Sequence, residues 1–223
     1  MTSTGTAFLW AVVALIMGLI FGYIMWGLGA TPAIPNTGTQ LSAAKEVPLS
    51  SAMRTLWSDH VWWTREYIEA VAANNGAAAN AAANALFQNQ VDIGNAIAPY
   101  YGSDAGQQLT DLLKDHITIA VDVLGAAKAG DTTALSEANA RWQKNADDIA
   151  TFLSQANPDN WQEAMLKDMM QTHLTTTLDE ASAALKKDYP GSIAAFYKVS
   201  EHIANLADTL SAGIIKQFPE KFI

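Results

Sequence analysis

The chain has 223 residues, of which half are hydrophobic and 16% are charged, a composition typical of a folded protein. Its 13 Lys and Arg residues face 22 Asp and Glu residues, and the resulting net charge of -9 argues against DNA or RNA as a partner. The absence of cysteine excludes disulfides, thiolate metal sites, iron–sulfur clusters and cysteine nucleophiles.

An uninterrupted apolar segment covers residues 7–29, and the first charged residue of the chain is Lys45. At a rise of ~1.5 Å per residue, a helix over this segment can cross a hydrocarbon layer of ~30 Å. Trp10 lies near one end and Tyr23 and Trp26 near the other, where such rings favour the membrane interface. A cleavable signal peptide is the alternative, but no basic residue precedes the segment and its apolar run exceeds the usual ~7–15 residues. We therefore expect residues 1–29 to form a transmembrane anchor that contacts the lipid bilayer through residues 7–29.

Few charges indicate on which side of the membrane the rest of the chain lies. Lys45 and Arg54 follow the span and would place it in the cytoplasm, but both are distant from the span. A sequence poor in Lys and rich in Asn, Thr, Ala and Trp is typical of exported proteins. The sequence favours a single-pass membrane protein with an extracytoplasmic (periplasmic) domain.

Residues 30–48 contain three prolines and a glycine among small residues, which predicts a semi-extended linker. Residues 49–223 show apolar residues at helical spacing and no sustained strand alternation. Gly, Pro or Asn marks each boundary. The fold class is therefore all-α, with the anchor followed by a soluble antiparallel bundle of about six helices. Their expected ranges are about 50–73, 77–98, 104–129, 132–156, 159–187 and 192–217.

The four histidines provide the main clue to function. His60, His116 and His173 each lie on the apolar face of a different predicted helix, and His202 lies at the edge of such a face. All four are near the middle of their helices, so antiparallel packing could bring them into one layer. Asn89, Gln90, Asn145 and Trp142 are expected at the same level.

Two interpretations of this layer remain open. Each histidine could be a core residue hydrogen-bonded to a neighbour, or several could bind a metal ion. Several imidazoles with little carboxylate suit copper, zinc or haem, and the thioethers of Met165, Met169 and Met170 near His173 favour copper. The candidate metal ligands are thus His60, His116, His173 and His202.

The carboxylates argue against a di-iron site, because no histidine has Glu three residues before it. Asp59, Asp115 and Glu201 directly precede histidines and are expected on solvated flanks rather than beside an imidazole. Asp92 and Glu180 are the other carboxylates that could take part. No common catalytic motif is present, so the sequence does not indicate an enzyme, and any catalysis would depend on the metal.

The aromatic residues Trp57, Trp62, Trp63 and Tyr67 surround one helix, for which we expect core packing rather than contact with a partner. The favoured hypothesis is a membrane-anchored bundle that binds a metal, copper before zinc or haem, in metal handling or in support of a membrane complex. The alternatives are a metal-free accessory module docking on a membrane protein, and a sensor-like bundle binding a small ligand. A sensor should continue into a cytoplasmic domain, and the six residues before the span argue against it.

Overall fold

A computed structural model describes residues 38–223, with side chains described from residue 46 onward. The predicted anchor at residues 7–29 and the first part of the predicted linker lie outside the described residues. The helices of residues 38–223 include none that is both long and apolar enough to cross a membrane.

Residues 38–223 form six long helices and one short 3₁₀ helix, and this part of the chain contains no strand. The prediction of an all-α fold is confirmed there. The elements are α2 Gly38–Ala72, α3 Gly76–Tyr101, α4 Ser103–Ala129, α5 Thr132–Ala156, α6 Glu163–Leu185, α7 Tyr189–Gln217 and η1 Pro219–Lys221.

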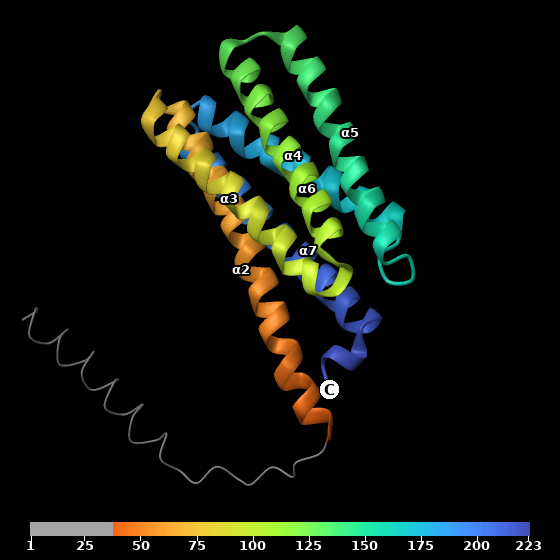
Figure 1. Cartoon of the computed structure of the whole chain (residues 1–223). Coiled ribbons are helices and arrows are strands. Elements are labelled where there is room, and N and C mark those ends of the chain that lie inside the picture. The colour runs from red at the N-terminus through yellow and green to blue at the C-terminus, as the bar shows by residue number, and fades with distance from the viewer. Residues whose placement is uncertain (1–37) are drawn as a thin grey trace, which may run out of the picture. The chain divides into compact units, whose positions relative to one another are not determined.

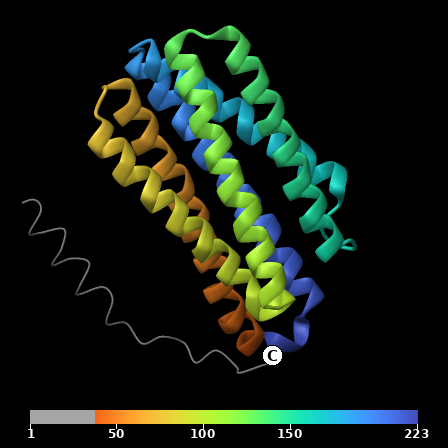
Figure 2. The same cartoon turned by 45° about the horizontal axis from the view of Figure 1, so that its top comes forward.

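Successive helices pack against each other as antiparallel neighbours, and α7 returns to pack against α2 (Figures 1 and 2). Helix α6 also contacts α2 and α4 across the bundle. Because direction alternates along the chain, α2, α4 and α6 run the same way and end at the same end of the bundle. This parallel set determines which side chains meet in the core.

Polar side chains define the helix starts that the sequence indicates. The carboxamide of Asn75 and the carboxylates of Asp131 and Asp188 each accept a hydrogen bond from a backbone N–H three residues later. Gly130 ends α4 in the left-handed conformation, at φ 69°, which glycine adopts without strain. These short connections keep consecutive helices side by side.

Four boundaries differ from the predicted ones by three residues or more. Helix α7 begins at Tyr189 instead of about residue 192, because the Asp188 carboxylate caps it there. Helix α2 begins at Gly38 and includes Pro48, where the sequence predicts the linker to continue; good helix formers before Pro48 offset its missing N–H. Helix α3 includes Pro99, because the rings of the two following tyrosines pack on Phe218 and hold the last turn. Helix α6 begins only at Glu163, because the backbone N–H of Trp161 bonds to the Asn157 carbonyl in a turn.

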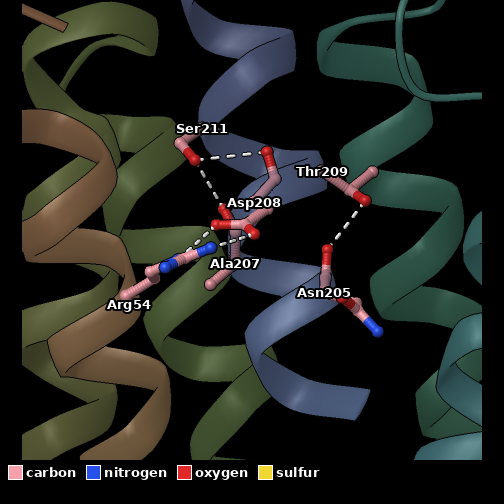
Figure 3. Close-up of polar contacts among 6 residues, drawn as sticks. All are labelled: Arg54, Asn205, Ala207, Asp208, Thr209 and Ser211. Carbon is pink, nitrogen blue, oxygen red and sulfur yellow. Dashed lines mark hydrogen bonds and ion pairs between the residues drawn. The ribbon is translucent and has the colours of Figure 1, made fainter. Parts of the chain in front are cut away.

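Two contacts fix α7 within the bundle. Trp161, buried before α6, donates its indole N–H to the Thr209 carbonyl at 3.3 Å and lies directly against Gly213. On the surface, the Arg54 guanidinium of α2 makes two parallel hydrogen bonds of 2.6 Å to the Asp208 carboxylate of α7 (Figure 3). The exposed ion pair adds orientation more than stability, because solvent screens it.

Candidate functional site

Three of the four histidines meet in the core of the bundle. His60 of α2, His116 of α4 and His173 of α6 are each 4% exposed or less. The ring centroids of His60 and His173 are 5.6 Å apart, and those of His116 and His173 are 6.0 Å apart. The predicted convergence is confirmed for these three, because their parallel helices bring mid-helix positions to one level. We call these three residues the histidine cluster.

Gln90 of α3 lies beside His60. Its amide nitrogen is 3.4 Å from His60 Nδ1, and it donates to the Leu86 carbonyl at 2.8 Å and to the side-chain oxygen of Asn89 at 3.1 Å. The Trp57 ring contacts His60 edge to face, with centroids 5.7 Å apart.

Asn145 of α5 fixes the tautomer of His116. The Asn145 amide nitrogen donates to the Leu112 carbonyl at 3.0 Å, so its oxygen accepts from His116 Nδ1 at 2.7 Å. The lone pair of His116 therefore lies on Nε2, a buried atom with no hydrogen-bond partner. The Trp142 ring packs against the imidazole with centroids 5.2 Å apart.

His173 lies between the other two rings, and its Nδ1 is buried without a partner. Buried polar atoms are nearly always hydrogen-bonded, yet three more atoms around the cluster are also buried without a partner: Trp57 Nε1, Gln90 Oε1 and Trp142 Nε1. The polar neighbours expected at this level, Gln90 and Asn145, are indeed there, and they leave His116 Nε2 and His173 Nδ1 unsatisfied.

His202 is placed differently. It is half-buried on α7, and its Nε2 donates to the Met169 carbonyl at 2.8 Å. It lies near enough to His173 to contribute to lowering the pKa of that residue. Because its Nε2 already has a hydrogen-bond partner, we do not count His202 in the histidine cluster. This agrees with its predicted position at the edge of the apolar face.

Burial keeps the histidine cluster neutral. It lowers the pKa of His60 to about 3, with a further contribution from His116 and partial compensation by the Gln90 hydrogen bond. It lowers the pKa of His116 to about 4, opposed by the Asn145 hydrogen bond. The pKa of His173 is well below its usual value, through burial and then through repulsion by the other histidines. Neutral imidazole is the form that binds metals.

The carboxylates lie away from the imidazoles, as expected for Asp59, Asp115 and Glu201, all of which are exposed. Glu180 is buried and pairs with Arg65 at 2.9 Å. Burial raises the Glu180 pKa to about 7, although the Arg65 guanidinium opposes this shift. Asp92 is exposed and accepts a hydrogen bond from Gln88. These carboxylates are thus exposed or paired elsewhere and do not contact the histidine cluster.

Among the described residues, no three His, Asp or Glu side chains have their ligand atoms arranged to hold a metal ion. The ring separations are nevertheless compatible with shared coordination. With a metal–nitrogen bond of ~2.0–2.1 Å, two imidazoles on one ion have centroids about 5 to 6.5 Å apart. Both observed separations fall in this range.

A second feature was not predicted from the sequence. A cavity of about 660 Å³ lies among α2, α3, α4, α5 and α6. Trp142 is one of its wall residues and also contacts His116. No sequence motif identifies such a cavity. Its walls are ordinary apolar helix positions whose side chains do not fill the space between the helices.

The expected core packing of the aromatic residues on α2 is confirmed for Trp57 and is wrong for two others. Trp57 is 3% exposed, whereas Trp62 is 52% and Trp63 is 36% exposed. Helix α2 packs mainly against α3 and α7, and the half-exposed Trp62 ring contacts Phe196 of α7 edge to face, with centroids 6.3 Å apart.

Comparison of the chain with protein-family models, with curated proteins and with solved structures gives no match. The function is therefore inferred from the geometry of the histidine cluster.

Proposed function

We propose that this protein binds one metal ion at the histidine cluster, with His116 and His173 as the principal ligands and His60 as the third. The observation that carries the proposal is the pair of buried, unpartnered nitrogens, His116 Nε2 and His173 Nδ1. A metal ion would supply the partner that both nitrogens lack. In its cellular role the protein would handle metal or support a membrane complex, as a single-pass, extracytoplasmic membrane protein anchored through residues 7–29.

Copper is favoured over zinc or haem. The histidine cluster has no carboxylate among its hydrogen-bond partners or ring contacts, and hard ions prefer carboxylate oxygens. Met170, three residues before His173, is buried in the core and offers a soft thioether. Met165 is 38% exposed and adds no support. Imidazole with thioether is a ligand set that suits copper.

The test is metal reconstitution of the full chain in detergent, with bound copper and zinc measured by elemental analysis. We expect about one copper per chain, and loss of most of it in His116→Gln and in His173→Gln. The matched control is His202→Gln, which removes an imidazole bonded to a backbone carbonyl and should leave the stoichiometry unchanged. Absence of bound metal in the parent chain, or full loading of both cluster variants, would contradict the proposal.

Membrane attachment has its own test. The full chain should remain in the membrane fraction after carbonate extraction, and its soluble domain should be open to protease added to cells whose outer membrane has been made permeable. A soluble form whose N-terminus lies within residues 30–36 would show instead that the apolar segment is cleaved.

A second candidate function is docking of the bundle on a membrane protein. An exposed apolar patch on α2 and the first half of α7 favours it: Trp62, Trp63, Tyr189, Ile193 and Tyr197. Patches rich in Trp and Tyr are common at protein interfaces. If reconstitution gives no metal, this interpretation is preferred. Trp62→Ser with Tyr197→Ser should then abolish co-purification with the partner while leaving the melting temperature unchanged.

A further inference from the structure

The cavity among α2 to α6 begins next to the histidine cluster and extends to one end of the bundle. Three wall residues lie one helical turn after the three clustered histidines: Thr64, Ala120 and Thr177. Others lie where the parallel helices end: Ala72, Lys128 and Lys186. From Thr64 to Ala72 along α2, at ~1.5 Å per residue, the cavity wall is about 12 Å long.

The wall is hydrocarbon along most of this length. Ile68, Leu86, Ile117 and Leu124 line it, and all four are buried. Two donor atoms of wall residues, Trp142 Nε1 and Thr177 Oγ1, are buried and have no hydrogen-bond partner. Because solvent reaches neither atom, neither one faces the cavity. An occupant of the inner part would therefore gain contact and burial, but no hydrogen bond from these two atoms.

Positive charge lies at the mouth. Among the described residues, the wall residues that are charged and exposed are Lys128 and Lys186 at the mouth, and Asp179, which lies two residues after Thr177 and so nearer the inner end. The Lys128 ammonium donates one hydrogen bond to the Val71 carbonyl at 2.6 Å, which leaves two N–H groups for other partners. In a chain of net charge -9, a mouth with two ammonium groups is locally cationic.

We propose that this cavity binds a straight-chain carboxylic acid, with its hydrocarbon chain along the apolar wall and its carboxylate between Lys128 and Lys186. A chain of about ten carbons matches a depth of about 12 Å, taken from the ~1.5 Å rise of α2. The lysine stems can cover the outer part of the chain while their ammonium groups remain in solvent. This site includes none of the three clustered histidines, so binding of the acid does not depend on the proposed metal site.

The first test varies chain length on the parent protein and needs no substitution. Hexanoate, octanoate, decanoate and tetradecanoate are titrated into the full chain in a detergent of unrelated structure, and heat is measured below the critical micelle concentration of each acid. Affinity should rise about fourfold with each added carbon and level off near decanoate. Lack of saturable binding by any of the acids would overturn the proposal, as would affinity that still rises at the same rate from decanoate to tetradecanoate.

The second test separates chain from head group. Lys128→Met and Lys186→Met should each weaken decanoate about two- to fivefold and leave decanol unchanged. Ala120→Phe, which fills the inner cavity, should abolish binding of both, whereas Ala140→Phe on the exposed side of α5 should change neither. Decanol binding as tightly as decanoate in the parent chain would overturn the assigned head group, and decanoate binding unchanged by Ala120→Phe would overturn the assigned site.

Discussion

Burial of three neutral imidazoles makes the metal-free protein sensitive to acid. An unfolded histidine has a pKa near 6.5, whereas in the folded chain the pKa of His116 is about 4 and that of His60 about 3. Between these values the unfolded state binds more protons, so stability is lost as pH falls from 6.5. For His116 alone the loss by pH 4 is about 3 kcal/mol. Urea unfolding of the metal-free chain should show this decline, with a shallower slope in His116→Gln.

Glu180 acts in the opposite direction. Its pKa is raised to about 7 in the folded chain from 4.5 in the unfolded one, so the folded state binds more protons between these values. Its contribution to stability therefore grows as pH falls from 7 to 4.5, by on the order of 3 kcal/mol. The stability gained through Glu180 at low pH offsets about the loss caused by one histidine. The total loss caused by the three histidines is therefore larger than this gain. A free energy of unfolding that is constant between pH 6.5 and 4 would contradict the structure of the cluster.

At this scale the sequence predicts which residues meet but not how they bond. Apolar spacing placed three histidines in the core and put Gln90 and Asn145 at the same level. It could not show that His116 and His173 keep a nitrogen unpartnered, or that His202 bonds to the Met169 carbonyl. Such details depend on side-chain rotation, which helical periodicity does not determine.

The packing of α7 against the turn before α6 depends on the absence of a side chain at one position. A Cβ added at Gly213 would overlap the Trp161 indole nitrogen and approach its Cδ1 to 2.6 Å. Trp161 is buried and cannot move aside. Gly213→Ala should therefore destabilise the protein by about 1–3 kcal/mol, measured by urea unfolding.

The control for this substitution lies on α4. Gly125 is exposed within the helix, and a Cβ there would meet no atom within 4 Å. Gly125→Ala should stabilise by about 0.5–1 kcal/mol through helix propensity. Equal effects of the two substitutions would show that the Trp161 contact is looser than described.

At the scale of elements, the Gly and Asn signals predict most helix ends, because their capping chemistry is local. The prolines were less informative. Pro48 and Pro99 both lie inside helices, since neighbouring residues favour the helix or pack against distant rings. Local patterns cannot include contacts made by residues more than a hundred positions away.

For the whole molecule, short connections predicted an antiparallel order, and that order explains why α2, α4 and α6 bring their histidines together. The cavity and the exposed face of α2 could not be predicted in this way. Both depend on how closely neighbouring helices approach and on which sides they leave uncovered, and a single helix does not encode either property.

Trp142 is a residue that the surroundings of the histidine cluster and the cavity wall have in common. Its ring contacts His116 on one side and forms part of the cavity wall on the other. A ligand in the cavity that shifts the Trp142 ring would also change the orientation of the His116 imidazole, and with it the affinity for copper. Thermodynamic reciprocity then requires copper to change the affinity for the ligand by the same factor. Decanoate should therefore bind with a dissociation constant that differs at least about fivefold between copper-loaded and copper-free protein. Trp142→Leu should remove most of this difference, and equal dissociation constants in the parent chain would mean that the two sites do not communicate.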